Sequence, residues 1–201
     1  MEKIGLHRVD NKSIENLNLR PMLNGKKVRI FYTDPPWGEG HMKYFNTINQ
    51  KETGRKSKPL LFIQLLEELK HMIKTYVDGY VFVEFGVKQL EDIKSKIAPG
   101  LYNIKIFDVF YKGGGKFLPC KILVAGTKPQ YKFKENLNGI KCQGYNLPQR
   151  CISEVGKKGE MVLDPLCGLG NVAKATIQED MVFIGNEFNR KRLARTKEIL
   201  Q

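Results

Sequence analysis

Asp34, Pro35, Pro36 and Trp37 place a carboxylate, a rigid backbone and an aromatic ring in four consecutive positions. The prolines exclude a helix, remove two backbone N–H donors and stiffen the chain. The Asp34 carboxylate beside the Pro35 carbonyl would present two acceptors with no competing donor, which suits an exocyclic amino group and its two N–H donors. The Trp37 indole offers a flat face on which a nucleobase can stack. The alternative is a Pro-Pro turn with a packed indole.

A second polar segment, 164–170, reads DPLCGLG and precedes a predicted helix. Gly168 and Gly170 allow the backbone to turn close to a ligand and the helix to begin against the preceding strand. The segment lacks the third glycine of a dinucleotide fingerprint and the Gly-Lys-Ser/Thr of a phosphate loop. Glu187 ends the next predicted strand, where an acid can accept both hydroxyls of a ribose. These features favour a nucleoside cofactor; the alternative is a turn whose glycines only cap and pack.

The elements that must position these residues alternate between strands and helices. Periodicity predicts strands at 27–32, 79–85, 102–111, 121–127, 160–164 and 181–186, with a hairpin turn at 113–115. It predicts helices at 59–77, 87–97, 148–155, 171–179 and 189–200. This order indicates an α/β fold with a doubly wound, mostly parallel sheet and helices on both faces.

Both polar segments follow the carboxyl end of a strand. Open α/β sheets bind ligands beyond these ends, at the point where the winding reverses. If 27–32 and 160–164 are the two central strands, the Asp34 and Asp164 tips are neighbours although they are far apart in sequence. The sequence therefore predicts one site with two halves.

Positive charge is unevenly distributed. The formal net charge is +13, and residues 101–150 hold nine basic and two acidic residues. A clustered cationic face is expected for a polyphosphate partner, and a solubilising surface explains the charge equally well. Two stretches have no hydrophobic period: 38–58, expected as a mobile basic active-site loop, and 128–147, expected as a basic insertion and minimal target-recognition element. The candidate nucleic-acid contacts are Lys51, Arg55, Lys56, Lys58, Lys112, Lys116, Lys132 and Lys134.

Length and composition limit the remaining classes. We expect 201 residues to form a single domain with a sizeable core. A mean hydropathy of −0.38 and 27% charged residues exclude wholesale disorder, collagen and coiled coil. No apolar run approaches a membrane span, and the first ten residues do not resemble a secretory signal, so we expect a cytoplasmic protein without a membrane partner. The four cysteines form no CxxC pair and have no histidine nearby, so we expect reduced thiols and no metal.

Taken together, these motifs resemble those of the S-adenosylmethionine-dependent amino-methyltransferases, which methylate N6 of adenine or N4 of cytosine in nucleic acid. The segment 34–37 matches the family's catalytic (D/N/S)-P-P-(Y/F/W) motif, and 164–170 resembles its cofactor motif, usually D-P-F-x-G-S-G. Glu187 matches the family's ribose-binding acid. The catalytic motif precedes the cofactor motif, as in the permuted class of these enzymes, and the resemblance covers nearly the whole chain.

The resemblance implies a Rossmann-like methyltransferase fold of seven strands, one of them antiparallel, in circularly permuted order. The segment 1–10 then corresponds to the strand after the last helix, with Asp10 near the cofactor adenine. The implied catalytic residues are Asp34, Pro35, Pro36 and Trp37; the implied cofactor-binding residues are Asp10, Asp164, Pro165, Cys167, Gly168, Gly170, Asn171 and Glu187. The implied reaction is transfer of the methyl group of S-adenosyl-L-methionine to N6 of adenine in DNA, with the base flipped or unpaired.

The sequence departs from the family pattern in two ways. Leu166, Leu169 and Asn171 replace the usual Phe, Ser and Thr of the cofactor motif. There is also no large target-recognition domain, and only 38–58 and 112–150 are candidates for reading the substrate. This implies loose sequence specificity or help from a second subunit, and it leaves a monomer and a homodimer open.

Other functions remain open at this stage. The substrate could be RNA adenine or DNA cytosine, although the Asp form of the catalytic motif favours adenine by resemblance. The chain could instead be a nucleic-acid-binding subunit of a methyltransferase heterodimer, against which the intact motifs argue. Methylation of a protein glutamine amide is known for the Asn-Pro-Pro-Tyr relatives, and the Asp34 form argues against it.

Overall fold

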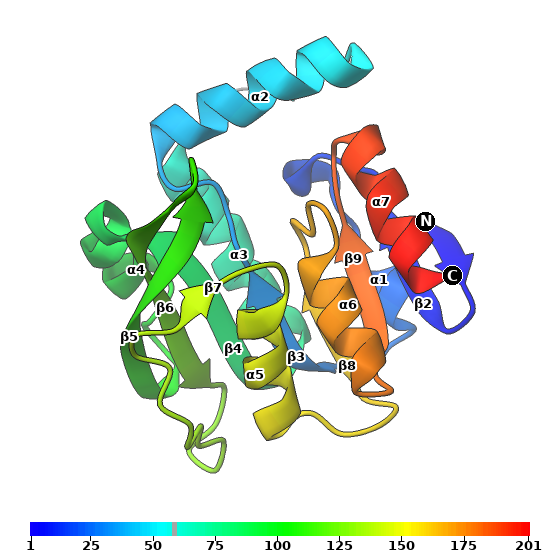
Figure 1. Ribbon diagram of the computed structural model, residues 1–201. Coiled ribbons are helices and arrows are strands. Elements are labelled where there is room, and N and C mark those ends of the chain that lie inside the picture. The colour runs from blue at the N-terminus through cyan, green and yellow to red at the C-terminus, as the bar shows by residue number, and fades with distance from the viewer. Residues whose placement is uncertain (58–59) are drawn as a thin grey trace.

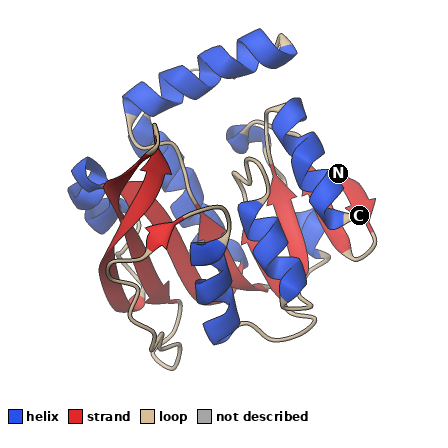
Figure 2. Cartoon of the chain, viewed as in Figure 1, coloured by secondary structure: helices blue, strands red, loops and turns tan. Residues whose placement is uncertain are grey.

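The computed structural model describes residues 1–57 and 60–201, and within them one nine-stranded sheet lies between two layers of helices (Figure 1, Figure 2). The strand order is β1-β2-β9-β8-β3-β4-β6-β5-β7. The strands are β1 (Glu2–Ile4), β2 (His7–Asp10), β3 (Val28–Thr33), β4 (Val77–Gly86), β5 (Tyr102–Gly113), β6 (Lys116–Gly126), β7 (Lys141–Cys142), β8 (Met161–Asp164) and β9 (Val182–Asn186).

The sheet is mostly parallel, as predicted. The antiparallel pairs are β1 with β2 and β6 with both β4 and β5, and the predicted hairpin 102–127 is present as β5 and β6. The predicted count of seven strands is exceeded by the short strands β1 and β7 at the two edges. With three and two residues, they are too short to carry a hydrophobic period.

The central strands are buried on both faces because both are covered by helices. In β3, Ile30 and Tyr32 face one hydrophobic cluster and Phe31 faces the other, and all three side chains are fully buried. Successive side chains of a strand point to opposite faces of the sheet, so neighbouring residues of β3 belong to different clusters. The run VRIFYT is therefore nearly all apolar, which is typical of a central parallel strand.

The helices divide between the two faces. One cluster contains residues of α5 (Asn146–Val155), α6 (Asn171–Gln178) and α7 (Arg190–Leu200); the other contains residues of α1 (Arg20–Leu23), α3 (Phe62–Tyr76) and α4 (Leu90–Lys96). Two short 3₁₀ turns, η1 (Ile14–Asn16) and η2 (Val87–Gln89), complete the connections. In the described residues no helix is both long and apolar enough to cross a membrane.

The expectation of an irregular loop over 38–58 is wrong for most of its length, because α2 (Glu39–Thr53) is a regular helix. It lies outside both helix layers, across the carboxyl end of the sheet (Figure 1). Asn49 is its one buried residue, so α2 has no apolar stripe and leaves no helical period in the sequence. The second stretch, 128–147, is irregular as predicted apart from β7 and the start of α5. Lys58, a predicted nucleic-acid contact, lies outside the described residues.

Candidate active site

The polar segments that follow β3 and β8 meet at one cavity. β3 and β8 are parallel neighbours, with Ile30 opposite Val162 and Phe31 opposite Leu163. Asp34 and Asp164 stand at their carboxyl ends and line a cavity of about 810 Å³. α3 returns on one face of the sheet and α6 on the other, so the winding reverses between β3 and β8. The prediction that these tips are neighbours at a shared crevice is confirmed.

Asp34 supplies a carboxylate to the first half of the cavity. One of its oxygens accepts a hydrogen bond from Nε1–H of Trp37, with 2.9 Å between the two atoms. Asp34 is exposed on the side that faces the cavity, and neighbouring residues exclude water from the rest of its side chain. This partial loss of water raises the pKa of Asp34 to about 6, while the hydrogen bond from Trp37 acts in the opposite direction. Asp34 is therefore mainly ionised at neutral pH and retains acceptor capacity for a further donor.

Trp37 is placed differently from the stacking platform predicted for it. Its ring contacts Tyr111 edge-on at 4.8 Å between centroids and stacks with His41 at 5.8 Å. Pro36 lines the cavity, whereas Trp37 and the buried Pro35 are not among its lining residues. The indole therefore orients the Asp34 carboxylate in this structure, and Tyr111 is the aromatic side chain of β5 that faces the cavity.

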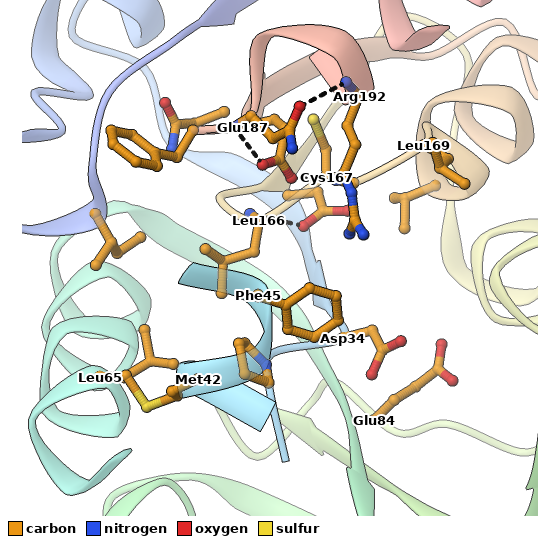
Figure 3. A pocket seen from close by; sticks show the side chains of 18 of the residues that line it. Asp34, Met42, Phe45, Leu65, Glu84, Leu166, Cys167, Leu169, Glu187 and Arg192 are labelled. Atoms are coloured by element: carbon orange, nitrogen blue, oxygen red, sulfur yellow. Dashed lines mark hydrogen bonds between the residues drawn. The ribbon is translucent and has the colours of Figure 1, made fainter. Parts of the chain in front are cut away.

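Glu84 of β4 brings a second carboxyl group to the same half of the cavity. Glu84 is 9% exposed, and its Oε1 accepts a hydrogen bond from the Tyr32 hydroxyl at 2.7 Å. Burial, followed by the negative charge of Asp34, raises the pKa of Glu84 well above its usual value, and the Tyr32 hydroxyl opposes this. Figure 3 shows the Asp34 and Glu84 carboxyl groups on the same side of the pocket.

The second half of the cavity is formed by the turn after β8. Asp164 is 2% exposed and accepts a hydrogen bond from the Leu166 amide at 3.1 Å, which shapes the turn. The Cys167 amide donates to the Asn186 carbonyl of β9 at 2.9 Å. The turn is thereby fixed against the neighbouring strand tip, with its backbone along the cavity wall.

Glu187 faces this turn from the end of β9. Its Oε2 accepts from the Gly168 amide at 2.9 Å and its Oε1 accepts from the Asn189 amide at 2.7 Å. Burial raises the pKa of Glu187, and these donors, with the charge of Arg192, act against the rise. Each carboxylate oxygen has a second lone pair, and the side chain lines the cavity. A pair of ribose hydroxyls therefore fits the acceptors that Glu187 still has.

Gly168 and Gly170 have backbone conformations that favour glycine. Their φ angles are +53° and +86°, in the left-handed region. A Cβ on Gly170 would lie 2.9 Å from Cδ1 of Ile199 and 3.1 Å from Cα of Thr196, so α6 could not begin this close to α7. Gly170 is therefore needed for the packing of α6 against α7, whatever ligand the turn serves, whereas a Cβ on Gly168 would meet no atom within 4 Å.

The predicted cofactor residues divide into two groups. Asp164, Cys167, Gly168, Asn171 and Glu187 line the cavity, whereas Asp10, Pro165 and Gly170 do not. Asp10 ends β2 opposite Asn186, and its carboxylate binds the N-terminal ammonium of Met1 at 2.9 Å. The Pro165 carbonyl accepts from the Asn186 side-chain amide at 3.1 Å.

The predicted nucleic-acid contacts are not gathered in one place. Lys51 and Lys56 are exposed at the end of α2 and just beyond it, and Lys112 and Lys116 are exposed on the β5–β6 hairpin. Lys132 and Lys134 are also exposed, but they follow Tyr131, whose hydroxyl binds Asp78 at the opposite end of the sheet. Of the described members of this set, Lys112 is the one that lines the cavity.

Arg55 is engaged within the protein. Its guanidinium donates to the Phe188 carbonyl at 3.0 Å and to the Asn11 side chain, and it lies 4.2 Å from the centroid of the Phe188 ring. These contacts connect the chain after α2 to the segments that follow β2 and β9. The structure therefore gives Arg55 a positioning role in place of an open phosphate contact.

α2 is fixed across the cavity by contacts near both of its ends. The Glu39 carboxylate accepts from the Phe62 amide of α3 at 2.6 Å, and Glu52 accepts from Asn189, the residue before α7, at 2.7 Å. Between them, the Phe45 ring lies 4.9 Å from the Arg192 guanidinium. Figure 3 shows Phe45 and Met42 projecting into the pocket. α2 therefore forms one wall of the site.

Several lining residues were not identified from the sequence. Lys12 follows β2, Lys43 belongs to α2, and both are exposed beside the cavity together with Lys112. No local motif marks these cations, because three separate elements bring them together. Glu84 did have a signal: it is a lone carboxyl group within the apolar run YVFVEF of a predicted central strand.

Solved structures with the same fold include DNA methyltransferases. M1.HpyAVI matches with a TM-score of 0.68 and 17% identity, over 96% of this chain and 98% of that one, and it has also been solved with S-adenosylmethionine. TTHA0409 of Thermus thermophilus, a proposed DNA modification methylase in complex with S-adenosylmethionine, matches at 0.64 and 16%, over 96% and 93%. The cytosine-N4-specific PvuII DNA methyltransferase matches at 0.59 and 12%, over 98% and 90%.

These likenesses establish the fold of the chain at identities too low to carry over an activity. Neither a protein-family model nor a curated protein matches the sequence. The function therefore rests on the residues that line the cavity.

Proposed function

We propose that this protein is an S-adenosylmethionine-dependent methyltransferase that acts on N6 of adenine in DNA. The observation that carries the proposal is the shared cavity at the tips of β3 and β8. One half holds the Asp34 carboxylate, and the other holds a glycine turn facing an acid that can take a ribose. The likeness of the fold to M1.HpyAVI and TTHA0409, both of which were solved with this cofactor, supports the same assignment.

The cofactor would lie along the turn after β8. Glu187 would accept its ribose hydroxyls, while the backbone at Cys167 and Gly168 and the side chain of Asn171 would surround the remainder. When bound, S-adenosylmethionine supplies a methyl group on a positively charged sulfur. The Asp34 and Glu187 carboxyl groups, which line the same cavity, would favour this positive charge in their ionised forms.

Asp34 would hold the amino group that accepts the methyl group. A carboxylate that accepts one N–H fixes the nitrogen and leaves its lone pair directed at the methyl carbon. Attack on the methyl carbon would break its bond to sulfur, which would leave as a neutral thioether, and the nitrogen would become cationic; the negative charge of Asp34 would stabilise that change. The methylated nitrogen then readily loses a proton, so no strong base is required. The Pro35 carbonyl, predicted as the second acceptor, would need to turn toward the cavity from its buried position.

The base must leave a duplex stack, or be unpaired, to enter a cavity of this depth. Tyr111 and Phe45 offer aromatic surface within the cavity, and Trp37 would supply the predicted stacking face only after its ring moved from its contact with Asp34. The exposed cations Lys12, Lys43 and Lys112 would contact the phosphates beside the base. The order of the two motifs along the chain fits the permuted class of these enzymes.

Cytosine N4 is the second candidate target. The PvuII enzyme of the same fold is cytosine-N4-specific, and the amino group of cytosine makes the same demands on Asp34. RNA presents the same base edges, and the cavity cations do not distinguish the two backbones. The target and the nucleic acid must therefore be decided by product analysis.

Mass spectrometry of nucleosides from DNA and RNA, incubated with the protein and methyl-deuterated S-adenosylmethionine, tests the proposal. The expected product is deuterated N6-methyldeoxyadenosine, absent when Asp34→Ala replaces the wild-type protein. N4-methyldeoxycytidine or N6-methyladenosine would correct the base or the nucleic acid. No labelled nucleoside from either polymer, with a folded and cofactor-binding protein, would reject the function.

A further inference from the structure

Glu84 is a buried ionisable group that lines the cavity and that the proposed reaction does not use. In the parallel pairing of β3 and β4, Thr33 lies opposite Val83, so the next residues along the two strands are Asp34 and Glu84. The two carboxyl groups consequently enter the cavity side by side (Figure 3). A carboxyl group at this depth is not expected as packing, because apolar residues would fill the position at lower cost.

Tyr32 fixes the orientation of the Glu84 carboxyl group. Its buried hydroxyl donates to Oε1 at 2.7 Å, which leaves Oε2 as the oxygen free to serve the cavity. Tyr32 lies on the strand that ends in Asp34, so the same strand positions both carboxyl groups. Glu84 lies within the sheet and Asp34 is the first residue beyond it, which favours a precise geometry.

The surroundings of Glu84 favour its protonated form. Burial removes water, and the nearby carboxylates of β3 and β8 repel a second negative charge. The groups that act on it are Asp34, Tyr32, Cys142 of β7, Asp164 of β8 and Cys151 of α5, and the cavity is also lined by the cations Lys12, Lys43, Lys112 and Arg192. A protonated carboxyl group carries an O–H donor.

We infer that Glu84 is a positioning and specificity residue that donates a hydrogen bond to the ring nitrogen next to the target amino group. This inference rests on the proposed function and identifies which base edge the site reads. Asp34 accepts from the amino group and Glu84 donates to its neighbour, so the pair presents an acceptor beside a donor. A flipped base is read through hydrogen bonds to this edge.

The pair matches one class of base. Adenine has an amino group beside N1, and cytosine has one beside N3; in both, a donor is next to an acceptor. Guanine and thymine place a carbonyl oxygen beside a ring N–H at the same edge, which is the reverse order. A site with an ionised Asp34 and a protonated Glu84 would leave both of its groups unpaired with those bases, which strongly disfavours them.

Replacement of the ring nitrogen tests the inference. The probes are an oligonucleotide that the wild-type protein methylates and the same oligonucleotide with 1-deazaadenine at the methylated position, where a C–H replaces N1. The ratio of the two single-turnover rates is measured in wild type and in Glu84→Ala. Because the variant has no donor, we expect the ratio to fall by about tenfold or more, the equivalent of one hydrogen bond of about 1.4 kcal/mol.

Glu84→Gln provides the matched control. Tyr32 would hold the amide oxygen and direct the amide N–H toward the base, so the ratio should stay near the wild-type value. The pH profile gives a second readout: wild type should lose kcat/KM at alkaline pH as Glu84 ionises, and Glu84→Gln should not. Both proteins should keep the acid limb near pH 6 from Asp34.

The outcomes separate the two proposals. Equal ratios in wild type and Glu84→Ala, or an alkaline limb that persists in Glu84→Gln, would overturn the role of Glu84 while methyl transfer itself remained. If wild type methylates neither adenine nor cytosine, the proposed function fails and the role of Glu84 fails with it. If Glu84→Ala does not fold, the pH profile of Glu84→Gln decides alone.

Discussion

The two ends of β4 carry acidic residues in opposite electrostatic settings. Asp78, near the start of the strand, accepts from Lys128 Nζ at 2.7 Å and from the Tyr131 hydroxyl at 2.8 Å, and these partners lower its pKa. Glu84, near the end, has Tyr32 as a hydrogen-bond donor but faces Asp34, and its pKa is raised. At one end of β4, Asp78 is therefore paired with a cation. At the other end, Glu84 lies beside a second acid.

The difference indicates what each end of the sheet does. The Asp78 cluster, with Arg29 over the rings of Tyr80 and Tyr131, neutralises its charge locally and holds the chain after β6 against the sheet. The cavity brings together Asp34, Glu84 and Asp164, whose pKa values are all raised, although cations also line it; such perturbed groups are typical of a functional site. The carboxyl end is therefore the functional end.

The largest contrast is expected from removal of one acid at each end. Asp34→Ala should lower the single-turnover rate of methyl transfer by about 10²–10³-fold or more, because the charge that stabilises the cationic nitrogen is lost. Cofactor affinity, measured by calorimetry, should change little. Asp78→Ala, the matched control, should leave the rate of the folded protein unchanged. Loss of cofactor binding with residual turnover in Asp34→Ala would contradict the assignment.

Glu187 tests the cofactor half of the cavity. Glu187→Ala should weaken binding of S-adenosylmethionine by about 10–100-fold, because two hydrogen bonds to a carboxylate are lost. The Gly168 amide would also lose its acceptor, so thermal unfolding should be followed in parallel. Unchanged affinity in a stably folded variant would exclude Glu187 as the ribose acid.

Stability should respond to pH with opposite signs at the two ends. Because folding raises the pKa of Glu84, its burial destabilises the fold increasingly as pH rises above about 4.5, and Glu84→Gln should remove this penalty. We expect a gain of about 1–2 kcal/mol in the free energy of unfolding at pH 8 and much less at pH 4.

Asp78 has a lowered pKa, so it stabilises the fold above its unfolded value near 3.8 and loses this effect as pH falls. Asp78→Asn should therefore destabilise by at most about 1 kcal/mol at pH 7, since the pair is partly exposed, and the loss should shrink in acid. Urea unfolding at several pH values measures both. If Glu84→Gln and Asp78→Asn changed the free energy of unfolding in the same direction, the contrast between the two ends would be invalid.

The smallest effect concerns nucleic-acid binding. Lys112→Ala should reduce the slope of log affinity against log salt by about 1, because one phosphate contact at the cavity is lost. Lys128→Ala, at the opposite end of the sheet, should leave the slope unchanged. Fluorescence anisotropy with a short oligonucleotide measures both, and an equal change in the two variants would place the binding face elsewhere.

The sequence predicted the elements whose burial leaves a pattern. The strand around Phe31 and the helix that begins at Phe62 could be located because apolar side chains repeat along them. α2 could not, since it buries little more than Asn49, and helix geometry without an apolar face has no period. The meeting of Asp34 and Asp164 followed from a general rule about parallel sheets, not from any local feature.

The orientation of side chains was harder to predict from the sequence. Whether Trp37 faces a base or donates to Asp34 depends on Tyr111 and His41, which lie on other elements. The cations at the cavity likewise come from three separate segments. Glu84 was not identified from the sequence either, although a single charge in an apolar strand is a signal that could have marked it.

A crystal structure of the protein with S-adenosylmethionine or its demethylated product bound tests the shared cavity most directly. The ribose hydroxyls should contact Glu187, and the sulfur should face Asp34 across the gap between the tips of β3 and β8. A ligand seated in the second hollow of the protein, beside Arg29 and Asp78, or one whose sulfur points away from Asp34, would contradict the proposed site.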